Sequence, residues 1–356
     1  MRRTDTLILG GGPAGAAAAI TLARAGHRPL VLERQRETGD ALCGGFLSWH
    51  SLAQVNRLGV MLDGHVVDEV RLFTGRGHAR APLPAPALGV SRRHLDTALL
   101  RRAERLGARV ERGVLAREAD GRTIRADGDV FAPDRLLLAT GKHDLRGLAR
   151  PKPRHDPALG LRVRLGPATA LNRLVGGAVE LHLFDRGYAG LVAQEDGTAN
   201  LCLAVRKSRL AEAGSPRALL DAIARELPSL ADRLGFLPPS PEIDAIASVP
   251  YGWRTADTQD GIYRLGDQAA VIPSLAGEGM GIALASGVMA AQAIANGRSA
   301  PAFQQALARR TRRPVALARA VLALAERPSG ARLLTCLTGL APGLAHLVAR
   351  ATRVAD

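Results

Sequence analysis

The hydrophobic pattern of the first 35 residues indicates two buried strands separated by a helix. Residues 6–9 form a short apolar run of the kind that a fully buried parallel strand shows. Small residues from 16 to 25 then indicate a helix, and Gly26 stands at its C-cap position. A second apolar run at 30–32 leads to Glu33. We predict a strand–helix–strand unit with parallel strands.

The following segment, up to residue 141, mixes helices with short strands. Residues 134–141 form another buried strand, which stops at Gly141. Residues 42–46 carry two glycines and are predicted to form a loop. Helices are predicted around 51–58 and over 91–106, and strands over 66–73, 78–90, 108–118 and 122–131.

The pattern changes after a basic, proline-rich crossing at 142–157. Strands separated by turn residues predict an antiparallel meander, which a helix near 216–227 and a strand near 243–250 follow. Residues 262–267 again show the pattern of a buried parallel strand. Residues 277–295 are predicted to form a long helix with a face of small residues, and the basic tail from 301 is predicted to be helical. The meander strands are predicted at 159–165, 179–184, 189–194 and 200–205.

Composition excludes several classes of protein. The 356 residues are 47% hydrophobic and 23% charged, which is ordinary globular composition. The net charge of +15 comes from 45 arginines and three lysines, and it favours anionic partners such as a phosphorylated cofactor, a membrane surface or an acidic carrier protein. Nucleic acid is not expected as a partner, because aromatic residues make up only 3% of the chain and the arginines are spread along it.

Three distant cysteines indicate a protein of the reducing cytoplasm with neither a disulfide framework nor a metal site. Met1-Arg2-Arg3 and the apolar run behind it resemble the start of a secretory signal. The interruption by residues 10–13, three glycines and a proline, fits a turn better than a signal helix. We therefore expect a cytoplasmic protein. The sequence leaves the oligomeric state open.

A glycine fingerprint at the first turn predicts a dinucleotide site. Gly10, Gly12 and Gly15 follow a strand and open a helix, and Glu33 stands 18 residues after the last glycine. Gly10 permits the tight turn, Gly12 leaves room for a pyrophosphate, and Gly15 lets the helix approach the sheet. The helix N-terminus favours phosphate, and Glu33 can accept hydrogen bonds from a ribose. The neighbouring Ala14 and Arg34 are also predicted to contact the cofactor.

A second segment, more than 200 residues further on, indicates a flavin. Gly266-Asp267 ends a strand, and Gly277, Gly279 and Met280 stand at the entry to a helix. Asp267 can accept from a ribityl hydroxyl, and the helix N-terminus can stabilise charge on the flavin ring.

These motifs, together with Ser91-Arg92-x-x-Leu95-Asp96 and Leu138-Ala139-Thr140-Gly141, resemble the FAD-dependent oxidoreductases of the p-hydroxybenzoate hydroxylase/geranylgeranyl reductase superfamily. The resemblance spans about residues 5–300. It implies that Arg92 contacts FAD, that Val114 and Leu115 lie beside the adenine, and that Gly141 lies near the cofactor. NADPH or NADH would then be a transient electron donor.

The resemblance also implies an α/β fold in which a Rossmann-type FAD-binding domain carries an inserted antiparallel-sheet substrate domain and a helical C-terminus. The FAD-binding domain is predicted to be discontinuous, over 1–65, 91–150 and 255–300. Residues 66–90 and 151–254 would form the substrate domain, and 301–356 the C-terminal helices.

Two branches of the superfamily are represented among the motifs. Cys43-Gly44-Gly45 resembles a segment of the geranylgeranyl reductase branch. Residues 268–271 lack the histidine that is usual in the hydroxylase branch. Thr140-Gly141 stands where the family usually has Asp-Gly. Cys43 either lines the site beside the flavin or packs as a small hydrophobe. The predicted substrate pocket consists of Gly44, Gly45, Tyr188, Tyr251 and Trp253, and His182 is predicted to be structural.

By a narrow margin we expect a monooxygenase that hydroxylates a hydrophobic, polyketide-like substrate through a C4a-hydroperoxyflavin. A C=C reductase of the geranylgeranyl reductase type is the first alternative. A non-enzymatic lipid-binding module of the same fold is the second.

Overall fold

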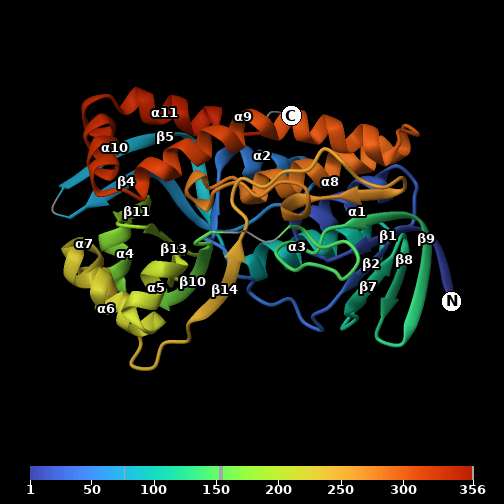
Figure 1. The fold of residues 1–356 in the computed structure, drawn as a ribbon, viewed down its shortest axis with the longest axis horizontal. Coiled ribbons are helices and arrows are strands. Elements are labelled where there is room, and N and C mark those ends of the chain that lie inside the picture. Colours follow the sequence, from blue (N-terminus) through green and yellow to red (C-terminus); the bar gives the residue numbers. More distant parts are fainter. Residues whose placement is uncertain (76, 152–154, 355–356) are drawn as a thin grey trace.

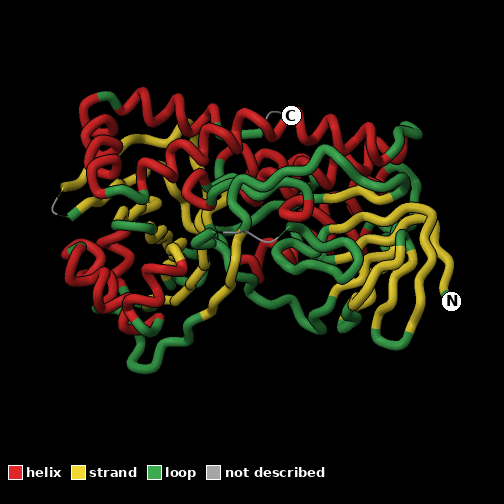
Figure 2. Tube along the Cα trace, in the orientation of Figure 1, coloured by secondary structure: helices red, strands yellow, loops and turns green. Residues whose placement is uncertain are grey.

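The computed structural model describes residues 1–75, 77–151 and 155–354, and its strands form two sheets that lie side by side (Figure 1; Figure 2). The first sheet comprises β1 (Arg2–Leu9), β2 (Leu30–Glu33), β6 (Arg109–Arg112), β7 (Ala116–Asp120), β8 (Thr123–Ala126), β9 (Asp129–Leu138) and β15 (Ile262–Arg264). The second comprises β3 (Phe46–Leu47), β4 (His65–Thr74), β5 (Gly77–Gly89), β10 (Ala158–Leu165), β11 (Ala178–Phe184), β12 (Gly187–Ala193), β13 (Ala199–Arg206) and β14 (Asp244–Val249).

The first sheet has a parallel part and an antiparallel hairpin, in the order β6-β2-β1-β9-β8-β7. β1 lies between β2 and β9, parallel to both, and β15 pairs with the second half of β9. β8 pairs with the first half of β9 in antiparallel fashion. Strands were predicted over 122–131 and 134–141, but the observed boundary lies elsewhere: β8 ends at Ala126, and β9 is a single strand over Asp129–Leu138. On the side away from β1, the first half of β9 pairs with β8 and its second half with β15.

Helices α1 (Pro13–Arg24), α3 (Arg92–Arg105) and α8 (Gly279–Ala295) cover this sheet. α1 packs against both α3 and α8. A Cβ at Gly287 of α8 would lie 2.2 Å from the carbonyl oxygen of Ala14, so only glycine permits this approach of the two helices. The predicted helix from 277 begins two residues later, because Gly277 has a left-handed backbone (φ 62°).

The second sheet has the order β14-β10-β13-β12-β11-β4-β5-β3. The predicted four-strand meander is wrong in one respect: only β11, β12 and β13 are consecutive neighbours, whereas β10 pairs with β13 and β14. α4 (Thr169–Val175), which the sequence analysis missed, separates β10 from β11, and β11 runs parallel to β4. A helix of seven residues is too short for its periodicity to be recognised in the sequence.

Helices cover one face of this sheet and leave the other facing the cavity described below. α4, α6 (Pro216–Glu226) and α7 (Pro228–Leu234) bury leucines, valines and isoleucines against β10–β13, and α5 (Lys207–Ala213) follows β13. This face also holds a buried polar cluster, in which Arg233 donates to Glu180 and His182 stacks on Phe73. Burial lowers the pKa of His182, which agrees with a structural histidine.

The C-terminal helices form a layer along one long edge of the molecule (Figure 1). α9 (Ala300–Ala325) is followed by α10 (Pro328–Leu340) and α11 (Pro342–Ala351), and both shorter helices pack against β5. α2 (Trp49–Arg57) lies beside α8. No single helix of the described residues is long and apolar enough to cross a membrane, but α10 and α11, bent by 111°, pass that test as a pair.

Candidate functional site

A cavity of about 960 Å³ runs between the two sheets from the first turn of the chain to the C-terminal helices. Its polar half follows the ends of the parallel strands, where α/β sheets usually bind ligands. The lining of that half includes Gly10, Gly12, Ala14, Glu33, Arg34, Arg92, Val114, Leu115, Gly141, Lys142, Gly266 and Asp267.

The first turn is tight because its glycines contact backbone. A Cβ at Gly10, whose φ is 102°, would lie 2.5 Å from the Ala139 carbonyl oxygen. A Cβ at Gly15 would lie 1.9 Å from the Gly10 carbonyl oxygen, so Gly15 lets α1 lie against the strand end and does not itself line the cavity. In the described chain no side chain caps the N-terminus of α1 at Gly12. Its free N–H groups therefore suit an anion.

Glu33 closes this turn from the end of β2. One carboxylate oxygen accepts from the Gly11 N–H at 2.7 Å, and the other accepts from the Gln35 N–H at 2.9 Å. Each oxygen keeps a further lone pair for a hydroxyl in the cavity. Val114 donates its N–H to the Glu33 backbone carbonyl, and Val114 and Leu115 line the same cavity as Glu33.

Arg92, at the start of α3, lies over the first turn. Its Nε and Nη2 donate to the two oxygens of Asp96 at 3.0 and 2.7 Å, and Nη2 lies 3.3 Å from where a Gly12 Cβ would be. Burial opposes the charge of Arg92, but Asp96 raises the pKa of the guanidinium above its usual value, so the arginine stays charged. Asp96 belongs to the recognised motif, but its role in positioning Arg92 is evident only from the structure.

The second flavin motif lies beside the first: a Cβ at Gly266 would lie 3.4 Å from the Ala14 Cβ. The Gly266 N–H donates to Ser286 Oγ at 2.8 Å, and the Asp267 carboxylate lies 3.7 Å from Lys142 Nζ. Arg150, which the sequence analysis missed, donates to the Asp267 carbonyl at 2.9 Å. These contacts hold the acid at the cavity wall while its side chain remains partly exposed.

α8 begins at the same wall, and Gly277, Gly279 and Met280 all line the cavity. A Cβ at Gly277 would come within 2.8 Å of the Phe46 ring, whereas a Cβ at Gly279 would meet open space. In the described chain no side chain caps this helix N-terminus either. Its N–H groups can therefore stabilise negative charge that develops on a bound ring.

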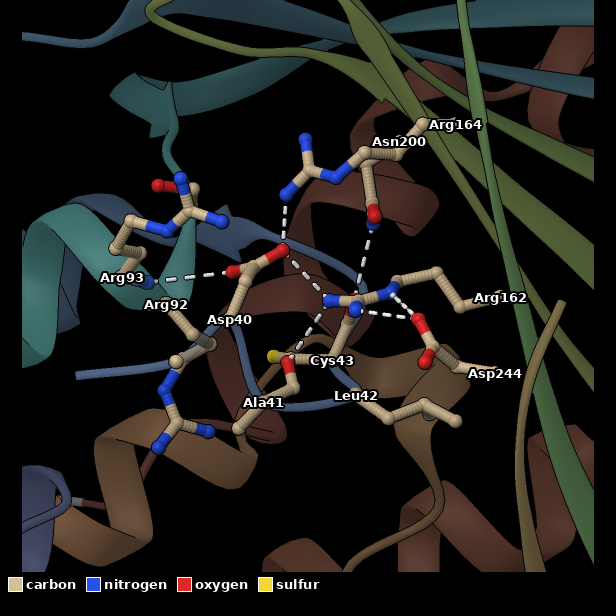
Figure 3. Close-up of polar contacts among 12 residues, drawn as sticks. Asp40, Ala41, Leu42, Cys43, Arg92, Arg93, Arg162, Arg164, Asn200 and Asp244 are labelled. Carbon is tan, nitrogen blue, oxygen red and sulfur yellow. Dashed lines mark hydrogen bonds and ion pairs between the residues drawn. The ribbon is translucent and has the colours of Figure 1, made fainter. Parts of the chain in front are cut away.

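The loop that carries Cys43 is held by charges from the second sheet (Figure 3). Asp40, which is almost fully buried, accepts from Arg162 Nη1 at 2.7 Å and also from Arg164. Arg162 additionally binds the Ala41 carbonyl at 3.2 Å and pairs with Asp244. This charge cluster ties the loop to β10 and β14, and the sequence analysis did not identify it.

Cys43, Gly44 and Gly45 all line the cavity. Asn200 Nδ2 donates to the Cys43 carbonyl at 2.9 Å, and Gly45 has a left-handed backbone (φ 72°) that favours glycine. Cys202 lines the cavity from β13, and burial raises the pKa of its thiol to about 12. Cys202 is therefore a neutral thiol at physiological pH.

The far half of the cavity is apolar. Tyr188 and Tyr251 line it, and both hydroxyls bond Ser274 Oγ at 2.5 Å. Burial raises the pKa of both tyrosines, so both keep their protons. Trp253, which was predicted to belong to this pocket, is not among the lining residues of the described chain; its ring lies against the Arg150 guanidinium.

This donor set fits FAD. Two uncapped helix N-termini and Arg92 face one continuous cavity. Glu33 would hold the adenosine ribose, and Arg92 with the α1 N-terminus would hold the pyrophosphate. Asp267 would hold the ribityl chain, and the α8 N-terminus the ring.

Comparison with known proteins agrees with this geometry. Residues 3–142 match the family model described as FAD binding domain. The menaquinone reductase of Mycobacterium tuberculosis (strain ATCC 25618 / H37Rv) is 27% identical, over 91% of this chain and 84% of its own. The menaquinone reductase of Mycolicibacterium smegmatis is 26% identical, over 83% of this chain and 77% of its own.

Solved structures share the fold. The flavin-dependent brominase Bmp2 superposes with a TM-score of 0.79 at 16% identity and covers 98% of this chain and 93% of its own. A geranylgeranyl bacteriochlorophyll reductase-like protein from Thermoplasma acidophilum gives 0.74 at 19% identity, with 98% and 99% coverage. The predicted α/β fold with a helical C-terminus is confirmed, residues 3–142 match an FAD-binding domain, and the chain resembles FAD-dependent oxidoreductases in sequence and in fold.

Proposed function

We propose that this flavoprotein reduces a carbon–carbon double bond in a long apolar lipid. One alkene carbon would receive hydride from reduced FAD held in the site. The other carbon takes a proton, so the substrate gains two hydrogens in total.

The observation that carries this proposal is the apolar half of the cavity. It extends from the Cys43 loop past the open face of the second sheet to α10 and α11. Leu72, Leu181, Leu183 and Leu275 contribute to a continuous hydrocarbon wall there. Such a wall suits a long hydrocarbon chain, whose binding depends on buried apolar area rather than on hydrogen bonds.

The polar side chains on this wall are arranged to keep protons. Tyr188 and Tyr251 share Ser274 as their hydrogen-bond partner, and burial raises the pKa of both phenols. A neutral phenol can donate its proton to the alkene carbon adjacent to the one that accepts hydride. Tyr251, which is less buried than Tyr188, is the donor that we assign.

The relatives support reduction over oxygenation. Both mycobacterial proteins that align with most of this chain are named menaquinone reductases, and menaquinone is an apolar lipid. The Cys43-Gly44-Gly45 segment, which resembles the reductase branch, lines the cavity. We therefore place the reductase ahead of the monooxygenase that the sequence favoured narrowly. The proposed electron donor is NADPH or NADH, which would bind transiently.

Product mass separates the candidate reactions. The FAD-loaded protein is incubated with a polyprenyl lipid and reduced with NADPH, once under nitrogen and once under isotopically labelled oxygen. A reductase yields a product heavier by two hydrogens under nitrogen, without labelled oxygen. A product that requires oxygen and carries one labelled oxygen atom supports the monooxygenase. Tight lipid binding without any product supports the non-enzymatic lipid-binding module.

A further inference from the structure

The last two helices expose an unusual number of leucines. Five leucines, which we call the leucine stripe, stand on α10 and α11 at short intervals. Single exposed apolar side chains are common at protein surfaces, but clusters of this size are not. The exposed fractions are 50% for Leu333, 37% for Leu337, 81% for Leu340, 43% for Leu344 and 62% for Leu347.

The leucine stripe stands on the two helices that close one end of the cavity. Leu337 and Leu344 line the cavity. Leu340 and Leu347 stand on the same two helices, do not line the cavity and are the most exposed of the five, so their apolar surface faces outward.

The C-terminal segment that carries the leucine stripe is positively charged. Residues 301–354 contain nine arginines, of which Arg353 is paired with buried Glu278, and one carboxylate, Glu326. Glu326 is largely buried and pairs with Arg206, so it adds no free negative charge to this surface. Arg332 and Arg350 are exposed on α10 and α11 themselves, and α9 exposes further arginines. An apolar stripe on a segment with exposed arginines complements a bilayer that contains anionic phospholipid.

The dimensions of the two helices favour a position in the membrane interface. α10 has 13 residues and α11 has 10, which correspond to about 20 and 15 Å. Both are shorter than the roughly 30 Å of a bilayer core, and the 111° bend prevents them from forming one straight span. A helix pair of this kind can bury its apolar face among the head groups without crossing the membrane.

We propose that residues 328–351 form a docking hairpin for anionic phospholipid membranes, and that docking places the end of the cavity formed by α10 and α11 next to the acyl chains. An apolar substrate then enters between Leu337 and Leu344 without crossing water. Docking is independent of the reaction that the site catalyses; only the entry of a lipid substrate rests on the proposed function.

Vesicle sedimentation of the full-length, FAD-loaded protein tests the docking. The vesicles contain phosphatidylcholine alone or phosphatidylcholine with phosphatidylglycerol. We expect binding to the anionic vesicles, weakened by high salt, and a loss of roughly tenfold or more in affinity for the double variant Leu340→Ser/Leu347→Ser. Neither leucine lines the cavity, so FAD content should not change.

The matched control is Met61→Ser, which removes a side chain of similar exposure (84%) outside the hairpin and should bind vesicles like the wild type. Equal binding by the wild type and the double variant would overturn the proposal. The proposal would also be overturned if the wild type were a dimer that does not bind vesicles and that dissociates when the two leucines are replaced. The leucine stripe would then be a contact between two copies of the chain. Sedimentation needs no substrate and therefore tests docking alone. A failure of the proposed reaction would be seen only in the measurement of product mass.

Discussion

Arg353 Nη1 lies 2.5 Å from Glu278 Oε2, and this ion pair joins the segment after α11 to the loop before α8. The same guanidinium donates to the carbonyls of Gly277 and Ala276 at 3.2 and 2.9 Å. Glu278 is fully buried and also accepts from the Val354 N–H. The C-terminal helices, which line one end of the cavity, are therefore connected directly to the wall where a flavin ring would lie.

Arg353→Met should destabilise the protein because it leaves the Glu278 carboxylate buried without its main partner. Breaking such a pair costs about 3–5 kcal/mol. We expect a lower free energy of unfolding in urea and weaker FAD retention. Arg350→Met, which changes an exposed arginine of the same region, should alter neither quantity. Equal stability of the two variants would show that the ion pair does not hold the loop.

Glu33→Ala and Asp267→Ala should each weaken FAD binding. Each loses charge-assisted hydrogen bonds worth on the order of 1.5–3 kcal/mol, which corresponds to roughly tenfold to a hundredfold in affinity. Titration of the apoprotein with FAD, followed by flavin fluorescence, measures the change. Glu37→Ala is the control, because Glu37 is exposed and does not line the cavity. Unchanged dissociation constants in both variants would refute the assigned roles.

Gly12→Ala and Gly287→Ala should fail in different ways. A Cβ at position 12 would meet only the end of the Arg92 side chain, at 3.3 Å, so the apoprotein should fold normally while FAD binding is lost. A Cβ at position 287 would meet the backbone of α1 at 2.2 Å and should lower the thermal midpoint of the apoprotein. Thermal unfolding and FAD titration distinguish the two effects. The opposite pattern would contradict the assignment of Gly12 to the phosphate site.

Asp40→Asn should loosen the loop that carries Cys43. The substitution removes the charge that Arg162 and Arg164 share, at a cost of about 1.5–3 kcal/mol. We expect faster alkylation of Cys43, measured by mass spectrometry of the digested protein. Asp244→Asn is the matched control: it also removes a partner of Arg162, but Asp244 is 41% exposed. If both variants alkylate at the wild-type rate, Asp40 does not order this loop.

Local motifs carried most of the sequence-based prediction. The Gly10–Gly15 turn and Glu33 lie within one strand–helix–strand unit, so their spacing along the chain already determines their spacing in space. The Gly266-Asp267 motif could be recognised for the same reason. A parallel strand, a left-handed glycine and a helix N-terminus each leave a pattern a few residues long.

Contacts between distant residues were decided only by the tertiary structure. Forty-five arginines offer many partners for each carboxylate, and nothing in the sequence selects Arg162 for Asp40 or Arg353 for Glu278. The pairing of β11 with β4 likewise depends on α4, which separates β10 from β11. The sequence alone thus determined the cofactor class, because that site consists of short-range motifs. The shape of the substrate cavity, including its lining by Leu337 and Leu344 of the C-terminal helices, was decided by packing between segments far apart in the chain.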